Sequence, residues 1–393
     1  MPQLPPSTEK QRRDGLCWAG LTALVLVLGA PILAGGALYY GDITVQFMPW
    51  RTVVAEGLRA GRLPLWDDAL FGGATLVGNP QAAMFYPWHW LAAAFSPALA
   101  LGLGYLLHLW LGLAGGWLLG RELGWRRSTA FAWACIYGLN GALVVRHQFP
   151  SLAYTIAWLP WLLWAAARLW RRPSPGRGLA WAGLVALQWL AGHAQMSLLM
   201  LAIVGVWCLT RRANGPMVPR WGWLLGGGAL GGLLAAVQLL PTAQEVLLSE
   251  RTSYELADVA RFFLTAPALA LGLQPRALGA PDALCGWLGR GPYWEALWYS
   301  GLATWPLALG ALGQRGAWRW ALLGGLGLVL ALGPLTVVYP VLLIVCPPLK
   351  LFRDPARFTY VTIIALAFLA ARGLERPAPA AREIGRASCR ERV

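Results

Sequence analysis

Long apolar runs limit what this chain can fold into. The first extends from Leu16 to Leu38, enough for an α-helix to cross a bilayer, and similar runs recur throughout the sequence. Hydrophobic residues make up 58% of the chain and charged residues only 12%, about half the charged share of a soluble domain. The sequence therefore predicts an all-α, polytopic transmembrane protein with about ten spans.

Basic residues predict the orientation of these spans. Lys10, Arg12 and Arg13 precede the first run, which places the N-terminus in the cytoplasm because basic loops stay on that side. The run is too long for a signal-peptide core, so we expect an uncleaved span. The segments assigned to the inside carry a basic excess, whereas the outer segments carry most of the acids. The net charge of +15 therefore reflects membrane topology, and nucleic-acid binding is excluded as its explanation.

Two stretches leave the path of the chain open. Residues 179–210 are too long for one ordinary span, so we expect two short spans joined at GHAQ (192–195), or else one long tilted helix. Residues 336–347 are rich in Pro and predict a re-entrant or interfacial helix. A short amphipathic helix is expected in the first outer loop, near 47–58. The remaining expected spans are 16–38, 98–119, 129–145, 152–169, 221–240, 298–312, 320–332 and 358–371.

The domain organisation follows from the same pattern. Residues 1–376 are expected to form one transmembrane domain. Residues 382–393 are polar and differ in character from everything before them, which suggests a non-native tail on a truncated chain.

Asp42 is the first acid after the first apolar run, and it is expected at the outer mouth of the membrane. A carboxylate in that position is costly to desolvate and often has a chemical role. Gln46 follows one helical turn later. The alternative is a solvated Asp that merely ends the helix. We interpret Asp42 as the catalytic general base.

The other outer segments contain amides, carboxylates, aromatic residues and arginines. They contain no nucleophile–His pair and no phosphate-binding Gly-rich loop, and the six Cys show no paired spacing. No cofactor is required by this set, and a divalent cation held by outer carboxylates stays open. Simpler roles exist, because His193 could be a hydrogen-bonded turn residue and the arginines could reach to lipid headgroups. The candidate substrate-binding residues are Gln46, Asn79, Gln81, His193, Gln195, Glu245, Arg251, Glu295, Arg353 and Arg357.

Such a set suits the transfer of a sugar from a lipid phosphate. The planar guanidinium groups of Arg353 and Arg357 could hold the leaving phosphate, and Asp42 could accept the proton of an acceptor hydroxyl. Glu295, His193 and Gln195 would support this arrangement. The hydrocarbon tail of the donor would lie in a groove between apolar helices.

A series of motifs in order along the chain resembles the YfhO family of bacterial membrane proteins. The motifs are GDITVQFMPW, GRLPLWDDALFGG, GNPQAAMFYP, GHAQ, QLLPTAQEVLLSER, YWEALWYSG and LKLFRDPARF. The resemblance implies a GT-C superfamily glycosyltransferase fold with a cytoplasmic N-terminus. It also implies a catalytic Asp in the first outer loop, which corresponds to Asp42, and members of the family are typically longer than this chain.

The sequence thus predicts a glycosyltransferase of the bacterial cytoplasmic (inner) membrane with an extracytoplasmic active site. Its partners would be a polyprenyl-phosphate-linked sugar, an envelope glycopolymer or protein acceptor, and membrane lipids. Two alternatives stay open. The chain could be a lipid-linked sugar flippase or transporter, which would require broken helices and polar residues within the spans. It could also be a non-catalytic membrane partner in an envelope assembly.

Overall fold

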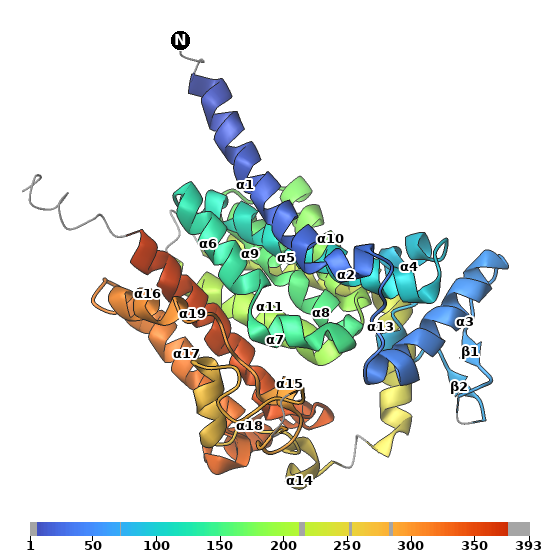
Figure 1. The fold of residues 1–393 in the computed structure, drawn as a ribbon. Coiled ribbons are helices and arrows are strands. Elements are labelled where there is room, and N and C mark those ends of the chain that lie inside the picture. Colours follow the sequence, from blue (N-terminus) through green and yellow to red (C-terminus); the bar gives the residue numbers. More distant parts are fainter. Residues whose placement is uncertain (1–5, 71, 212–216, 251–253, 283–285, 376–393) are drawn as a thin grey trace, which may run out of the picture.

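The computed structural model describes residues 6–70, 72–211, 217–250, 254–282 and 286–375. The expected tail at 382–393 and the candidate Arg251 lie outside these residues. Nearly all regular structure is helical (Figure 1), with one two-stranded antiparallel sheet of β1 (Trp66–Asp67) and β2 (Ala74–Thr75). The α-helices are α1 (Pro6–Leu28), α2 (Ala30–Leu33), α3 (Met48–Arg59), α4 (Pro87–Ala92), α5 (Pro97–Glu122), α6 (Arg127–Gly138), α7 (Gly141–Val144), α8 (Pro150–Ala157), α9 (Leu159–Arg171), α10 (Pro175–Leu190), α11 (Ala194–Leu209), α12 (Val218–Leu234), α13 (Ala236–Leu248), α14 (Leu256–Val259), α15 (Tyr293–Ala296), α16 (Thr304–Ala311), α17 (Ala317–Ala331), α18 (Val338–Val345) and α19 (Thr359–Leu374).

Proline marks the start of several of these helices. Pro87, Pro97, Pro150 and Pro175 occupy the first helical positions of α4, α5, α8 and α10. Proline fits there because its fixed φ suits the helix and its missing N–H removes a donor that has no partner in the first turn. The prolines therefore divide the apolar sequence into separate helices.

The structure does not confirm about ten spans. Three helical stretches are long and apolar enough to cross a membrane, namely Pro97–Glu122, Pro150–Arg171 and Pro355–Leu374. Two bent pairs raise this number to five if each pair forms one span: α6 with the segment Gly141–Gln148, bent by 44°, and α12 with α13, bent by 77°. The count covers only the described residues. The chain is a helical membrane protein with fewer clear spans than the hydropathy suggests.

Three stretches show how local sequence changes the expected spans. The first run is not one helix, because α1 ends at Leu28 and α2 covers only Ala30–Leu33, around Pro31. Residues 179–210 form two helices, α10 and α11, rather than a single tilted one. Gly192 lies in the turn between them with a φ of +100°, which a side-chain-bearing residue adopts only with strain. The expected short helices near 47–58 and 336–347 are present as α3 and α18.

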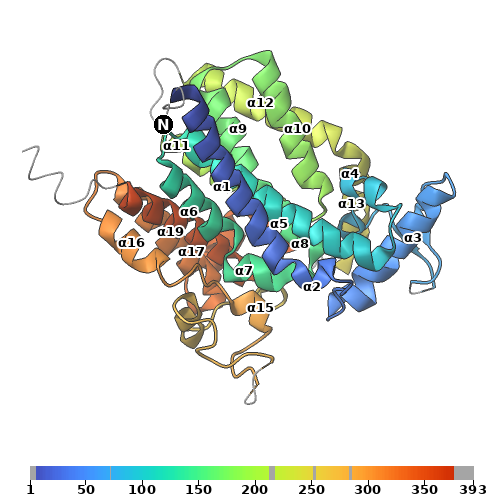
Figure 2. The ribbon, with the colours of Figure 1, turned by 45° about the horizontal axis from the view of Figure 1, so that its top comes forward.

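Helix α5 forms the centre of the larger half of the molecule. It packs against α6, α8, α9 and α1 (Figure 2). Small residues allow the closest approach, because a Cβ added at Gly116 would lie 2.9 Å from the Cα of Ala134, and one at Gly120 would lie 2.8 Å from the Cα of Ala130. Close packing of small residues is the usual way in which helices associate within a membrane.

Helix α19 joins this half to the C-terminal helices. It packs between α16, α17 and α6, and nearly all of its side chains are buried. The ring of Phe368 stacks on Trp320 of α17 at 4.1 Å and contacts Trp133 of α6 at 5.3 Å. The side chain of Thr362 donates to the carbonyl of Gly324 at 2.8 Å. These contacts hold α19 in place beside α6 and α17.

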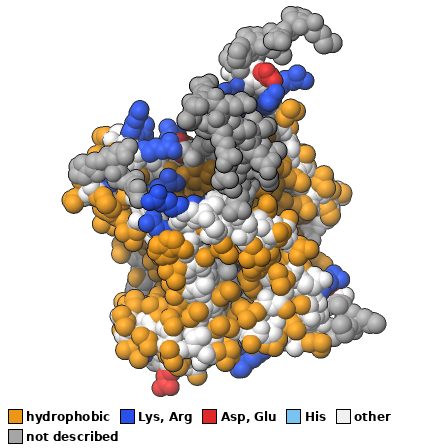
Figure 3. Space-filling view, turned by 90° about the vertical axis from the view of Figure 1, so that its left-hand side faces the viewer, with side chains coloured by type: hydrophobic (Ala, Val, Ile, Leu, Met, Phe, Trp, Pro, Cys, Tyr) orange, Lys and Arg blue, Asp and Glu red, His pale blue; other side chains and the backbone are white. Residues whose placement is uncertain are grey.

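Charged residues gather at the two ends of the helices. Ion pairs near the N-terminus join Arg127 to Asp14 at 2.6 Å and Arg171 to Glu122 at 3.0 Å. Most of the Lys and Arg side chains visible in Figure 3 lie toward this end, above a surface that is largely hydrophobic. Away from the N-terminus, α15 and α18 lie in the lower part of Figure 1.

Candidate functional site

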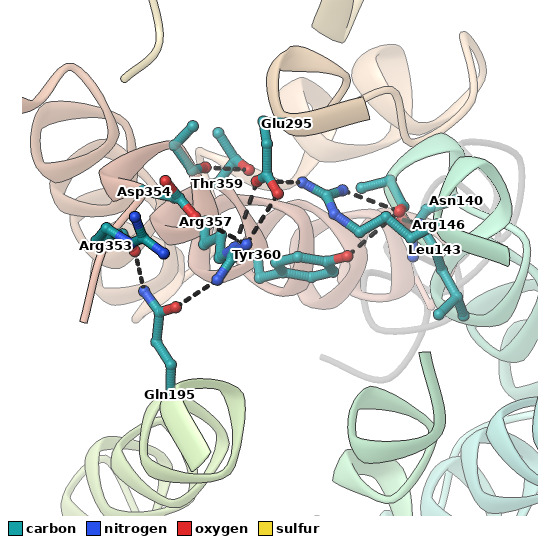
Figure 4. A network of polar contacts seen from close by, with 12 residues as sticks. Asn140, Leu143, Arg146, Gln195, Glu295, Arg353, Asp354, Arg357, Thr359 and Tyr360 are labelled. Carbon is teal, nitrogen blue, oxygen red and sulfur yellow. Dashed lines mark hydrogen bonds and ion pairs between the residues drawn. The ribbon is translucent and has the colours of Figure 1, made fainter. Parts of the chain in front are cut away.

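A buried ion-pair network lies at the end of the molecule opposite the N-terminus (Figure 4), with Glu295 at its centre. Glu295 belongs to α15, and its carboxylate accepts from the NH2 nitrogen of Arg146 at 3.1 Å and from that of Arg357 at 3.0 Å. Glu295 is only 4% exposed. A carboxylate so placed is stable because two guanidinium groups replace the water that it loses.

The break between α6 and α7 positions Arg146. Asn140 lies at this break, and its side chain accepts from the backbone N–H of Leu143 at 2.9 Å, which starts the next helix. The chain then enters the short 3₁₀ segment Val145–Gln148, where Arg146 is fully buried. Its guanidinium donates to the carbonyl of Ala142 at 2.9 Å and lies 5.2 Å from the ring centroid of Tyr360. The third apolar run was expected to be one span ending outside, and it instead bends and brings this arginine into the core.

Arg357 receives three polar partners. It lies in the 3₁₀ segment Pro355–Phe358, directly before α19. Besides Glu295, it bonds the Oε1 of Gln195 at 2.6 Å and forms an ion pair with Asp354 at 2.8 Å. The Nε2 of Gln195 donates in turn to the carbonyl of Arg353 at 2.6 Å. Gln195 therefore links the turn before α11 to the segment before α19.

Arg353 lies beside this network without an ion pair among the described residues. Its guanidinium lies 5.5 Å from the ring centroid of Tyr254, a cation–π arrangement. The two arginines expected to act together thus differ in their surroundings. Arg357 is engaged by two carboxylates, whereas Arg353 stacks on an aromatic ring and its guanidinium donates to none of the described residues.

The network shifts the acidities of its carboxylates in opposite directions. Burial raises the pKa of Glu295, but the charges of Arg357 and Arg146 outweigh burial and lower this pKa to about 2. Burial raises the pKa of Asp354 above its ordinary value despite its contact with Arg357, and the nearby Glu295 adds to the rise. Glu295 is therefore ionised throughout the physiological range. With three arginines and two carboxylates, the cluster has an excess of positive charge when both acids are ionised.

His193 starts α11. Its Nδ1 accepts from the backbone N–H of Met196 at 3.4 Å. Burial, assisted by the charge of Arg357, lowers the pKa of His193 to about 3, so the ring is neutral near pH 7. A Cβ added at the neighbouring Gly192 would lie 2.3 Å from the carbonyl oxygen of Pro80, so this turn packs closely against the loop around Pro80. His193 has the environment of a helix-capping residue.

Asn79, Gln81 and Glu245 hold that loop. The side chain of Asn79 accepts from the backbone N–H of Gln81 at 3.1 Å and so closes a turn of its own loop. Glu245 is exposed on α13, and a Cβ at Gly78 would lie 2.2 Å from its Cγ. The structure thus gives Asn79 a local structural contact and places Glu245 against the same loop, apart from the ion pairs of Glu295.

Asp42 precedes the π-helical segment Ile43–Phe47, which also contains Gln46. Both side chains are partly exposed, and partial burial raises the pKa of Asp42 above its ordinary value. The segment lies next to the network, because a Cβ at Gly41 would lie 2.4 Å from the Oε1 of Gln148, two residues after Arg146. A second link runs through Phe149, which packs on the cluster containing Ile43 and Phe47, and whose ring lies 6.0 Å from that of Trp294.

Sequence reasoning missed two members of the network. Arg146 directly follows the expected span 129–145 and has no role in the sequence prediction, nor has Tyr360, whose hydroxyl donates to the carbonyl of Ala142 at 3.2 Å. A largely apolar run that ends in Arg is the one available signal for Arg146. Within the described residues, no group of three or more His, Cys, Asp or Glu side chains could hold a metal ion, so the possible divalent cation gains no support there.

An apolar crevice lies along α19. It has a volume of about 190 Å³ and lies between α16, α17 and α19. Thr362 and Leu369 of α19 line it, and Thr362 is only two residues after Tyr360. The crevice therefore runs along the helix whose first turn belongs to the charged cluster. Its other lining residues include Trp305, Leu309, Trp320, Leu328 and Leu366.

Comparison with known proteins gives one informative likeness. No family model matches the sequence, and no curated protein matches it. Among solved structures, the cryo-EM structure of the arabinofuranosyltransferase AftD from Mycobacteria is similar over 94% of this chain, with a TM-score of 0.50 and 18% identity. The match covers 26% of the AftD chain, so the present chain spans about a quarter of that protein's length. At this level of identity the likeness shows the fold alone, which is that of a helical membrane protein.

Proposed function

We propose that the chain is a membrane glycosyltransferase that moves a sugar from a polyprenyl-phosphate donor to a cell-envelope acceptor outside the bacterial cytoplasmic membrane. One observation carries the proposal. A cluster of arginines with surplus positive charge lies at the start of α19, and an apolar crevice follows the later turns of the same helix. The partly buried carboxylate of Asp42 adjoins Gly41, which approaches Gln148 near Arg146. These features match the phosphate, the hydrocarbon tail and the acceptor proton of such a reaction.

The roles follow from the surroundings of each group. Arg353 has donors available for the leaving phosphate, whose growing negative charge they would stabilise without a covalent step. Arg357 supplies further positive charge but is held in place by Glu295, Asp354 and Gln195. The donor tail would lie in the crevice along α19.

Asp42 would act as the general base toward the acceptor hydroxyl. Its raised pKa suits that role, because a base whose pKa lies nearer to the working pH accepts a proton more readily. His193 is a weaker candidate because its pKa of about 3 makes it a poor base. Gln46 follows Asp42 by one turn and would bind sugar hydroxyls.

The decisive assay uses the purified protein in liposomes with a radiolabelled polyprenyl-phosphate sugar and an envelope glycan acceptor. We expect labelled product from the parent and about 10²–10⁴-fold slower product formation from Asp42→Asn. The matched control is Asp68→Asn, which changes an exposed acid of the same outer loop. Equal product formation by the parent and by Asp42→Asn would remove Asp42 from the reaction.

The two bent helix pairs favour one second candidate, a lipid-linked sugar flippase. Helices broken in the membrane are typical of transporters, and here the bends are 44° and 77°. The same liposomes distinguish the two functions, because a flippase moves the labelled lipid between leaflets without forming product. Neither turnover nor movement would indicate a non-catalytic partner in an envelope assembly.

A further inference from the structure

Arg51 is buried on α3 without a counter-ion. It is 4% exposed, and its NH2 nitrogen donates to the carbonyl of Gln81 at 3.1 Å. The Nε and NH1 nitrogens have no hydrogen-bond partner, and none of the ion pairs in the described ranges includes Arg51. Buried guanidinium groups are normally paired, because an unpaired one loses the hydration of its charge. The Nε and NH1 nitrogens of Arg51 therefore need a hydrogen-bond acceptor that is not one of the described protein groups.

A small cavity lies beside these donors. Its volume is about 10 Å³, which is the room that one water-sized group needs. His89 of α4 also lines it, is 4% exposed, and has an Nε2 without a partner among the described residues. The rest of the lining is apolar and comes from α3, α4 and the start of α5, including Val54, Ala92, Phe95 and Pro97.

The rim of the cavity carries a second positive charge. The Nε of Arg59 donates to the carbonyl of Ala93 at 2.6 Å, and its NH2 donates to that of Phe95 at 2.6 Å. Both acceptor residues line the cavity. Glu56, the one acid of α3, is exposed. Burial lowers the pKa of Arg51 to about 10, so Arg51 is still charged at neutral pH.

We propose that Arg51 and His89 form a binding site for a phosphate oxyanion. One phosphate oxygen enters the cavity and accepts hydrogen bonds from Arg51, while the rest of the group lies at the mouth near Arg59. The cavity admits one oxygen and no more, so the ligand must present a projecting oxygen, as a phosphodiester headgroup does. Burial lowers the pKa of His89 well below its ordinary value, so the neutral ring can offer an N–H to the same oxygen. This site is separate from Asp42 and Glu295 and goes beyond the proposed sugar transfer.

The test measures the thermal shift of the delipidated protein in detergent, with phosphatidylglycerol in one arm and inorganic phosphate in the other. We expect a saturable stabilisation that Arg51→Gln abolishes. The matched control Arg62→Gln removes an equal charge from an exposed position just after α3 and should leave the shift unchanged. A shift with phosphatidylglycerol alone identifies a lipid headgroup, and a shift with both ligands identifies phosphate itself.

A second variant covers the case in which Arg51→Gln does not fold. Arg51→Lys keeps the charge but loses the forked donors, so we expect about 10-fold weaker binding of the same ligand. Native mass spectrometry would count the bound lipids per chain in each protein. An unchanged affinity in Arg51→Lys, or no shift of the parent with either ligand, would overturn the proposal.

Discussion

Glu295 accepts a hydrogen bond from Arg146 at 3.1 Å, although 149 positions separate the two residues in the sequence. The pair joins the bend after α6 to α15, and both side chains are almost fully buried. Removal of one partner from a buried ion pair leaves an uncompensated charge, which is costly.

Arg146→Leu should therefore lower the free energy of unfolding by about 3–5 kcal/mol, because it removes one of the two arginines that compensate Glu295. Unfolding of the detergent-solubilised protein, followed by circular dichroism, would measure the change. Arg276→Gln is the control, since it breaks an exposed ion pair with Asp282, and exposed pairs contribute little. Equal stability of the Arg146 variant and the parent would show that Glu295 does not depend on this arginine.

Acidification should weaken the network in a defined pH window. The pKa of Glu295 falls from an ordinary 4.5 to about 2 on folding, so its contribution to stability is complete above pH 4.5 and is lost as the pH falls toward 2. Glu295→Gln should lower stability at neutral pH and flatten this part of the pH profile. Thermal unfolding measured from pH 5 to pH 2 tests the expectation, and an unchanged slope in the variant would contradict it.

His193 should affect the stability of the fold at higher pH than Glu295 does. Its pKa falls from 6.5 to about 3 on folding, so the unfolded chain takes up a proton first, and stability begins to fall as the pH drops below 6.5. His193→Asn keeps a side-chain acceptor at the start of α11 and should flatten the profile between pH 6.5 and pH 3. Sugar transfer at pH 7 should be largely retained. A loss comparable with that of Asp42→Asn would instead assign His193 a role in the reaction.

Asp42 should set the acid limb of the activity profile. A base must be deprotonated, and partial burial raises the pKa of Asp42 above 3.8, so kcat/KM should fall with decreasing pH through a value above this reference. The substitution Asp42→Asn should lower kcat by about 10²–10⁴-fold and remove that limb. Initial rates from pH 4 to pH 8 in liposomes provide the measurement. An acid limb that persists in the residual activity of the variant would belong to another group.

Arg353 and Arg357 should respond differently to truncation. Arg353 stacks on Tyr254 without an ion pair among the described residues, so Arg353→Ala should raise KM for the lipid donor and leave thermal stability nearly unchanged. Arg357→Ala should raise KM for the lipid donor and also lower thermal stability, because it leaves Glu295 and Asp354 with one fewer buried partner. Steady-state kinetics with varied donor and varied acceptor, combined with thermal unfolding, would separate the effects. A rise in KM for the acceptor alone would contradict a phosphate role for Arg353.

Local sequence patterns indicate part of the fold well. The apolar runs predict a helical membrane protein, and the GHAQ turn predicts the division of 179–210, because Gly192 permits a positive φ that other residues adopt only with strain. The interfacial helix near 47–58 and the short helix near 336–347 also follow from local composition. The number of spans does not follow from local composition, because bends such as the one at Asn140 depend on capping and packing. A hydropathy profile averages these effects away.

The candidate site is only partly visible in the sequence. The polar residues of the segments expected outside the membrane include Gln195, Glu295 and Arg357, which the structure brings into one network. Arg146 escapes notice because its partner lies far away along the chain, and no local pattern records such a pairing. The roles of Asp42 and Arg353 in sugar transfer stay predictions until the reaction is measured.

The crevice along α19 has a consequence for the choice of lipid. From Thr362 to Leu369 the helix rises by about 10 Å, so under the proposed function the crevice would hold only the first segment of a donor tail that enters from the charged end. Carbon atoms beyond that length would lie outside this crevice. Isoprenoids of very different lengths should therefore compete on nearly equal terms, and selection among donors would rest on the headgroup.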